Sequence, residues 1–323
     1  MIGHGMAGQQ IDDTARVAAL RELLPATGAG IYLDTATRGP LAAEAAEAMR
    51  EAAEWDLRVG RVSPGREDDL EQRDAEARAV LAALIGATDP NAIVLAHDIE
   101  DALDLGRSLL GEAVQVTEHV DALDGRLAEA EGALLDASLS AGAIALSVEE
   151  CGAHGVALAG DRWLLGPEGS GALWLRDGEL AERARRRLLA RSTVLGLARS
   201  VGWLAMYVGL EWAYQRTASL AGRLAAALAG SDGVELLTPL PPPAAVVTFR
   251  LAGWPAEDAA DELNHRVQAL VRPLAGPNVI RASVGWFNTE TELDHFAEAV
   301  AELARHTPQT LPRRPRLVVL PGA

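Results

Sequence analysis

Apolar residues recur three and four positions apart along much of the chain, which is the spacing of one helix face. This pattern predicts helices over residues 11–24, 41–57, 66–86 and 99–110, and later over 199–229, 255–270 and from 290 to about 304. The stretch 199–229 carries Trp203, Tyr207, Trp212 and Tyr214. Helical spacing alone does not decide whether these aromatic side chains pack inside the chain or at an interface.

Two short apolar runs predict strands between the helices. Residues 92–96 (A-I-V-L-A) are continuously apolar, as in a buried strand, and a helix is expected directly after them. Residues 245–250 (A-V-V-T-F-R) follow a run of three prolines and alternate in a way that suits a half-buried sheet.

Composition and charge exclude several classes of protein. The 323 residues suffice for one large or two ordinary domains. No apolar run approaches about eighteen residues, so no membrane span is expected, and residues 1–10 lack a secretory signal pattern. Cys151 is the only cysteine, which fits a reducing cytoplasm. The net charge of −17 argues against nucleic acid as a partner, although solubility alone explains it. We find no metal-ligand spacing.

Residues 158–174 form the most informative motif, L-A-G-D-R-W-L-L-G-P-E-G-S-G-A-L-W. It resembles, without a gap, the cofactor-lysine segment S-G-H-K-W-L-x-G-P-x-G-x-G-x-L of the class V aminotransferases. These pyridoxal phosphate (PLP) enzymes of fold type I include cysteine desulfurases, isopenicillin N epimerase-like proteins and the ergothioneine lyase. Arg162 stands where the family has the lysine that forms the Schiff base with PLP, and Asp161 stands where it has a histidine.

The exchange of lysine for Arg162 changes what this position can do chemically. A Schiff base needs an amine that can lose its proton, whereas a guanidinium stays protonated and is a poor nucleophile. No other lysine can take over, because all 29 basic residues are arginine. A compositional bias toward arginine explains the surface, but it does not normally remove a working catalytic residue.

Two further segments carry the family's substrate contacts. Residues 31–40 resemble the Y-L-N-x-x-x-x-G-P-L loop of the epimerase-like branch, which lies beside the substrate and implies a substrate contact for Thr35. Residues 279–289 resemble I-R-x-S-x-x-x-x-N-T, and Arg281 matches the arginine that grips the substrate carboxylate.

Residues 134–144 resemble the cofactor segment V-D-G-A-Q-S-A-G-A-I. Asp136 matches the aspartate that pairs with the pyridine nitrogen of PLP, while Leu139 replaces the family's glutamine or histidine. His119 is a candidate for the histidine that stacks on the cofactor ring, but we favour a solvent-facing loop histidine.

Two departures from the family pattern concern the cofactor and the sheet. The phosphate-binding turn S-G-x-T is replaced by H-D-I-E at residues 97–100, and two carboxylates there would repel a phosphate dianion. As residues of a helix N-terminus they favour the helix dipole, which is sufficient to explain them. The segment between Gly111 and Asp136 is short, so that at least two strands of the family sheet are expected to be missing.

The resemblance implies a truncated fold type I architecture, with a mainly parallel α/β sheet and a small α+β C-terminal domain. The expected divisions are an N-terminal helical segment (1–29), the large domain (30–198), a linking helix (199–229), the small domain (230–310) and a tail (311–323). Family members are dimers with active sites at the interface. A homodimer, or a heterodimer with a lysine-bearing paralogue, is therefore expected.

Three hypotheses follow for the function. The first is a pseudoenzyme without covalent PLP catalysis, which serves as a partner or regulatory subunit of an active paralogue or binds a small molecule. The second is lysine-independent chemistry on an amino-acid or carboxylate substrate, with Arg162, Asp136, Arg281 and Asp161 converging in the former PLP pocket. Its simpler alternative is that Arg162 forms a salt bridge with Asp136 or Asp161. The third is an active PLP enzyme, although Cys151 does not lie where a desulfurase has its nucleophile. We expect PLP at most as a non-covalent ligand.

Overall fold

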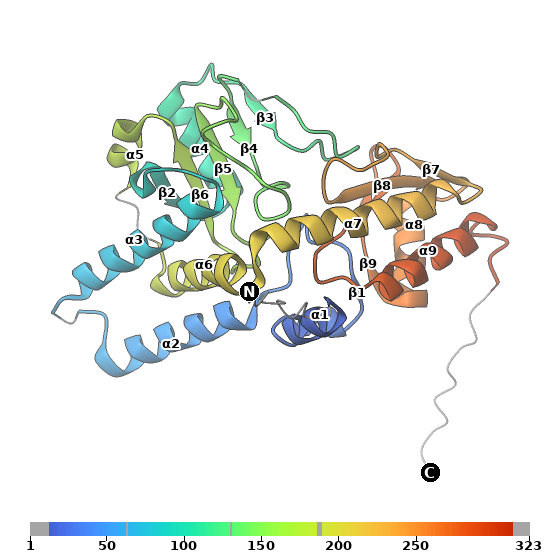
Figure 1. Cartoon of the computed structure of the whole chain (residues 1–323), viewed down its shortest axis with the longest axis horizontal. Helices are drawn as coiled ribbons and strands as arrows, with labels where there is room; N and C mark the ends of the chain where they lie inside the picture. The colour runs from blue at the N-terminus through green and yellow to red at the C-terminus, as the bar shows by residue number, and fades with distance from the viewer. Residues whose placement is uncertain (1–12, 63, 130, 186–188, 313–323) are drawn as a thin grey trace, which may run out of the picture.

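The computed structural model describes residues 13–62, 64–129, 131–185 and 189–312 (Figure 1). Two sheets lie on opposite sides of this view, and helix α7 (Leu210–Ala229) runs from one toward the other. Most of the predicted tail and part of the predicted N-terminal segment, residues 313–323 and 1–12, lie outside the described residues.

The larger sheet has five strands in the order β2-β6-β5-β4-β3. Their bounds are β2 Ile93–Ala96, β3 Val116–Glu118, β4 Leu134–Asp136, β5 Gly155–Ala159 and β6 Gly171–Leu175. Strands β3, β4 and β5 pair in parallel, and β6 runs antiparallel to both of its neighbours, β5 and β2. Four strands therefore point the same way, and the sheet is mixed but mainly parallel.

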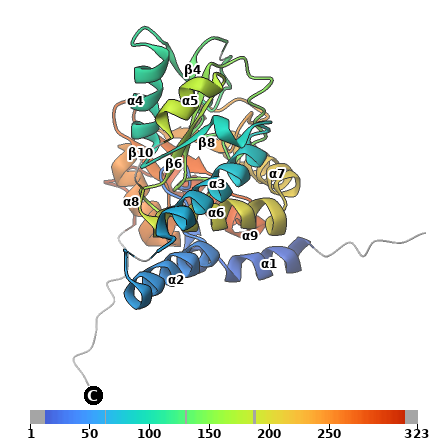
Figure 2. The ribbon, with the colours of Figure 1, turned by 90° about the vertical axis from the view of Figure 1, so that its left-hand side faces the viewer.

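Helices cover both faces of this sheet, which explains why β2, β5 and β6 are buried throughout. Alternate residues of β2 face opposite sides, so Ile93 and Leu95 pack with α3 (Arg66–Leu84) and α6 (Arg191–Trp203). Val94 and Ala96 pack instead with α4 (Ile99–Leu110) and α5 (Gly178–Ala184). Helix α2 (Ala43–Val59) lies on α6 beside α3 (Figure 2).

The smaller sheet is antiparallel, with the order β10-β11-β8-β7. Its strands are β7 Val234–Leu236, β8 Val246–Leu251, β10 Arg272–Leu274 and β11 Val279–Ser283. Val247, Phe249 and Ile280 on one face form a core with α7, α8 (Ala256–Val267) and α9 (Glu290–Ala304). Val246, on the other face, packs with side chains that precede and follow the larger sheet's strands, such as Leu139. The second face is thus turned toward the larger sheet.

Short elements join these layers. They are α1 Asp13–Glu22, the 3-10 turns η1 Pro25–Gly28 and η2 Pro90–Ala92, and a parallel pair made of β1 Ile31–Tyr32 and β9 Ala269–Leu270. The predicted helix over 255–270 is too long, because Gln268 adopts a left-handed conformation that ends α8 and the chain then enters β9.

The single linking helix predicted over 199–229 is wrong. Helix α6 passes into a π-helical turn, η3 (Leu204–Val208), and the chain then bends by 82° into α7. Gly209 makes the bend with a φ of 83°, a conformation that glycine adopts most easily. Helix α6 therefore packs on the larger sheet and α7 on the smaller one.

No single helix in the described part of the chain is long and apolar enough to cross a membrane. The bent pair Arg191–Val208 and Leu210–Ala229 meets that test only when its two arms are taken together.

Candidate ligand-binding site

A cavity of about 350 Å³ lies between the two sheets, a volume within the range of small-molecule sites. Three carboxylates and three guanidinium groups line it, together with hydroxyls and apolar side chains. The charged residues are Glu100, Glu118, Asp136, Arg162, Arg272 and Arg281; the others are Ala36, Thr37, Val120, Ala122, Ser138, Leu139 and Leu274. The structure thus brings Asp136, Arg162 and Arg281 together.

Two larger grooves, of about 1040 and 950 Å³, lie along α2, α3 and α6. Many of their charged side chains pair with one another, as Arg50 does with Glu54 and Arg66 with Asp56. In the smaller cavity, none of the three arginines forms an ion pair with any carboxylate of the described residues. Unpaired charge marks the smaller cavity as the better ligand site.

Two of the three carboxylates come from the carboxyl ends of neighbouring parallel strands, and the third from the helix that follows β2. Glu118 ends β3 and Asp136 ends β4, and the two are paired in register. Glu100 lies in the first turn of α4, directly after β2. An oxygen of Asp136 accepts a hydrogen bond of 2.9 Å from the backbone N–H of Ser138, which fixes the turn that follows the strand. The acidic groups thus share the sheet edge where α/β proteins usually bind ligands.

Arg162 lies in the loop between β5 and β6, and its Nη1 donates a 2.7 Å hydrogen bond to Oγ of Ser138. The salt bridge that we considered with Asp136 or Asp161 is absent among the described residues. Asp161 does not line the cavity; its carboxylate lies 3.7 Å from Arg38. Burial raises the pKa of Asp161, and the positive charges of Arg162 and Arg38 oppose that rise.

Close backbone contacts hold the Arg162 loop in place. The N–H of Gly39 donates to the carbonyl of Asp161 at 2.8 Å, and a Cβ atom at Gly39 would overlap the carbonyl of Arg162. Glycine is therefore required where the 31–40 segment crosses this loop. On the other side, Oγ of Ser200 in α6 donates to the carbonyl of Leu164 at 2.6 Å.

Arg281 lies in β11 and is only 7% exposed. Its Nε has no hydrogen-bond partner, and its Nη2 lies 3.4 Å from Oγ1 of Thr37, which is a long contact. Burial lowers the pKa of Arg281; Asp34 opposes this, and Arg162 and Arg272 add to it. The guanidinium is thus buried at the cavity without a carboxylate within ion-pair distance, an unfavourable state that a bound anion would relieve.

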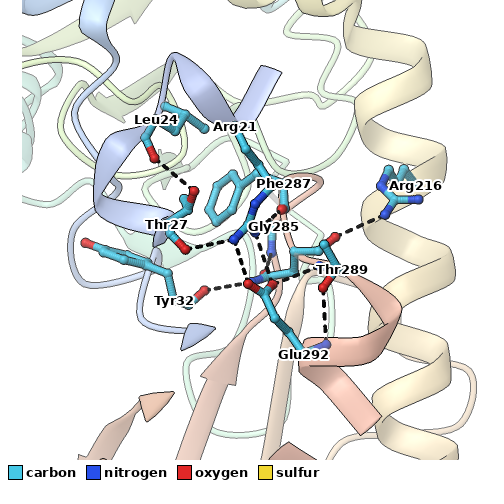
Figure 3. A network of polar contacts seen from close by, with 10 residues as sticks. Arg21, Leu24, Thr27, Tyr32, Arg216, Gly285, Phe287, Thr289 and Glu292 are labelled. Carbon is cyan, nitrogen blue, oxygen red and sulfur yellow. Dashed lines mark hydrogen bonds and ion pairs between the residues drawn. The ribbon is translucent and has the colours of Figure 1, made fainter. Parts of the chain in front are cut away.

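The residues that follow Arg281 fix its strand to the start of the chain (Figure 3). Asn288 is fully buried; its amide donates to the carbonyl of Tyr32 at 3.1 Å and accepts from the N–H of Gly285 at 2.8 Å. Thr289 and Glu292 form a capping box at the start of α9. Arg21 of α1 then binds Glu292 at 2.7 Å. The N-T pair of the motif therefore has a structural role here.

Thr35 is fully buried with its Oγ1 unpartnered and does not line the cavity, whereas Thr37 does. The resemblance implied a substrate contact for Thr35, but the chain turns within 34–37, and it is the later threonine, Thr37, that lines this cavity. His119 is half-buried, with Nδ1 2.8 Å from Oγ of Ser140, and burial lowers its pKa. It lies outside the cavity lining and is less solvent-facing than expected.

The turn at residues 97–100 caps α4. Asp98 accepts a hydrogen bond from the N–H of Asp101 at 2.8 Å, and Asp101 accepts one from the N–H of His97, also at 2.8 Å. Carboxylates of the chain itself therefore occupy amide donors that a phosphate would need at this helix N-terminus. The residues present do not fit a phosphate group.

Sequence reasoning missed Glu118, Ser138 and Arg272 as cavity residues. A usable signal existed for Arg272, because the turn G-P-N at 276–278 predicts a hairpin that places Arg272 opposite Arg281. Glu118 and Ser138 carried no such signal, because only the parallel register of β3 and β4 brings them to the cavity.

No family model matches the chain. Among curated proteins it is similar to the probable cysteine desulfurase of Xylella fastidiosa strain Temecula1, with 24% identity over 208 residues, or 53% of this chain and 50% of that protein. The homologue of strain 9a5c is 26% identical over 178 residues, 44% of this chain and 42% of that protein. The chain thus matches about half the length of these curated relatives.

Solved structures agree over most of the chain. A lysine-to-alanine mutant of C-DES, with glycine covalently linked to its PLP cofactor, superimposes with a TM-score of 0.78 and 17% identity, covering 87% of this chain and 98% of that one. The apo cysteine desulfurase of Thermococcus onnurineus NA1 superimposes with a TM-score of 0.77 and 20% identity, covering 93% of this chain and 100% of that one. These likenesses confirm the predicted α/β fold of type I, with a mainly parallel sheet and a small antiparallel one, and the chain shares that fold with the cysteine desulfurases.

Proposed function

We propose that this chain is a class V aminotransferase-like protein that has lost covalent PLP catalysis and binds a small carboxylate-bearing molecule in the cavity between its sheets. The observation that carries the proposal is Arg281, which is buried at the cavity with an unpartnered Nε and no carboxylate partner among the described residues. The proposal requires ligand binding and does not require turnover.

Two features argue against PLP as the occupant. No lysine exists to form the imine, and a guanidinium such as that of Arg162 is a poor nucleophile. The helix N-terminus at 97–100 is capped by Asp98 and Asp101, whose carboxylates occupy the amide donors that the cofactor's phosphate would need. The residues that are present therefore do not fit this cofactor, and we derive no step through it.

A carboxylate suits the cavity for reasons of both charge and geometry. A guanidinium presents parallel N–H donors that match the two oxygens of a carboxylate, and such pairs are stronger than neutral hydrogen bonds. Because the contact of Arg281 with Thr37 is long, the parallel N–H donors of its guanidinium remain free to bind a carboxylate. Arg272 lies directly opposite Arg281 on the neighbouring strand and adds a second positive charge.

The test is binding of small carboxylates by calorimetry and by thermal shift, with lactate, pyruvate, succinate and the common amino acids as probes. We expect at least one to bind wild type and to raise its melting temperature. Arg281→Gln should abolish this effect while the variant still unfolds cooperatively. Arg250→Gln is the matched control, because Arg250 lies on the adjacent strand and pairs with Glu235 at the surface. Binding that survives Arg281→Gln would refute the proposed role of the cavity.

A second candidate, partnership with another subunit, is favoured by an exposed apolar patch on η3. Met206 is 89% exposed and Tyr207 66% exposed, which is unusual for side chains of this size. Tyr207 also lines the larger groove along α2 and α6. Aromatic and methionine side chains are enriched at interface cores. The partner would be a second copy or a lysine-bearing paralogue.

A further inference from the structure

We propose that residues 119–128 form a strap that gates the cavity, and that the strap opens by releasing its contact with β8 of the smaller sheet. Val120 and Ala122 of the strap line the cavity together with Arg281. Displacement of the strap would therefore remove one wall and expose the buried guanidinium. The inference rests on the proposed function for what enters the cavity, whereas the opening itself can be tested without a ligand.

The strap is a closed unit with its own hydrogen bonds. The N–H of Ala128 donates to the carbonyl of His119 at 3.0 Å, which closes the base of the strap. The carboxylate of Asp121 accepts hydrogen bonds from the N–H groups of Leu123 and Asp124, at 2.8 and 2.9 Å, which shapes its tip. The strap can therefore move as one body without breaking the bonds that hold its shape.

The two ends of the strap are held in different ways. At the base, the N–H of His119 donates to the carbonyl of Asp136 at 2.9 Å, and Nδ1 of His119 lies 2.8 Å from Oγ of Ser140. Both contacts belong to the larger sheet and the turn that follows it. Among the described residues, no hydrogen bond or ion pair joins residues 120–128 to the smaller sheet. The tip is thus held by packing alone.

Gly125, at the tip, makes the contact with the smaller sheet, toward which the chain runs after β3 (Figure 1). It is buried, and a Cβ atom there would lie 2.9 Å from Cγ2 of Val246 in β8 and 3.3 Å from the carbonyl oxygen of the same residue. A valine side chain is stiff and could not move aside easily. The contact therefore depends on the absence of a side chain at Gly125.

The packing that holds the tip is small in area. Val246 belongs to an apolar cluster of eight buried residues, four of which are alanine, and Val120 is the member that the strap contributes. Alanine side chains bury little apolar surface, so this cluster stabilises the docked strap only weakly. Few buried apolar contacts and no crossing hydrogen bonds are the features of a segment that opens locally, without unfolding of the whole chain.

The experiment compares two glycines of similar backbone conformation. Gly125 and Gly132 have φ values of 76° and 73°, but the nearest atom to a Cβ at Gly132 would be 4.0 Å away. Both alanine variants carry similar backbone strain, so a difference between them reports the contact with Val246. The readout is the rate at which phenylglyoxal modifies Arg281, measured by mass spectrometry after digestion with a protease that does not cut at arginine. Arg216, whose side chain is 10% exposed, monitors global unfolding.

We expect Gly125→Ala to raise the rate of Arg281 modification ~10-fold over wild type, the shift in an opening equilibrium that an overlap of this kind produces. The rate at Arg216 should stay unchanged, and Gly132→Ala should stay within about twofold of wild type at both arginines. Equal rates at Arg281 in wild type and Gly125→Ala would overturn the gate. So would an equal acceleration in the two variants, or a parallel rise at Arg216, because strain or global unfolding would then be the cause.

The outcomes separate the gate from the proposed function. If carboxylates bind and Arg281→Gln abolishes their binding, while Gly125→Ala leaves the modification of Arg281 unchanged, the gate is overturned and the carboxylate site stands. If Gly125→Ala exposes Arg281 and none of lactate, pyruvate, succinate and the amino acids binds, the gate stands and the proposed occupant is overturned.

Discussion

Arg162 lies in a loop whose position is fixed by contacts other than those of its own side chain. Its loop is held by the backbone of Asp161 against Gly39 and by Ser200 against Leu164, so the position is preserved whatever residue occupies it. One N–H of the guanidinium donates a hydrogen bond to Oγ of Ser138, and the group cannot act as a nucleophile. A lysine at the same position could form an imine with PLP, but only if the rest of the cofactor site were present.

We therefore expect that Arg162→Lys alone will not restore turnover. In this variant Asp98 and Asp101 would continue to cap α4, so the helix N-terminus would not offer its amide donors to the phosphate of PLP. Incubation with PLP should not give the absorbance band of an internal aldimine. Nor should L-cysteine be converted to alanine and sulfide when dithiothreitol is present as the two-electron reductant. The wild-type chain, treated with PLP and borohydride, serves as the control and should carry no cofactor on the Arg162 segment. Sustained turnover by the single mutant would mean that the loss at residues 97–100 matters less than we infer.

The site was predictable where a residue's own motif carries its role. Asp136, Arg162 and Arg281 were identified in this way, and all three line the cavity. Thr35 is buried and Thr37 lines the cavity in its stead, because a motif gives the segment and not which threonine of a turn faces the cavity. Glu118 was missed because its position depends on strand register, which local sequence does not specify.

At the scale of elements, the junction between β11 and α9 fixes the strand of Arg281 to Tyr32 and to α1. The start of α9 at Glu290 was predictable, because Thr289 and Glu292 have the spacing of a capping box. The bend at Gly209 was not recognised, since a π-helical turn continues the apolar spacing and only the glycine marks the break. Of the four aromatics in that stretch, Trp203 and Trp212 pack on Trp286.

Asn288→Ala should lower the free energy of unfolding by ~2–4 kcal/mol, because it leaves the buried N–H of Gly285 and the carbonyl of Tyr32 without a partner. Urea unfolding followed by circular dichroism measures the change. Asn264→Ala is the control, since the amide of Asn264 makes a single long contact of 3.4 Å with Ala269 and should cost less than about 1 kcal/mol. Equal losses for the two variants would show that Asn288 has no special structural role.

At the scale of the whole molecule, the exposed apolar groups are unevenly distributed. Leu57 and Val62, near the end of α2, are 86% and 96% exposed, and Met206 and Tyr207 project from η3. The net charge of −17 opposes non-specific association but does not cover these groups. The distribution favours an interface on the side of the molecule formed by α2 and α6.

We accordingly expect the chain to associate, either with itself or with a lysine-bearing paralogue. Light scattering at micromolar concentration, with and without that paralogue, should give the mass of a dimer in at least one sample. Met206→Ser combined with Tyr207→Ser should shift that mass toward the monomer. Leu240→Ser removes an apolar side chain exposed elsewhere and should leave the mass unchanged. A monomeric mass in both wild-type samples would remove the partnership model.

The charged side chains of the cavity come from two different sheets. Glu118 and Asp136 belong to the larger sheet and Arg272 and Arg281 to the smaller one, and the docking of Gly39 on the Arg162 loop fixes the larger sheet's loop against the segment that pairs with β11. The distance between these two groups of charges is therefore set by how the two sheets pack together. A side chain at Gly39 would disturb this packing and with it the spacing of the charges that any occupant of the cavity meets.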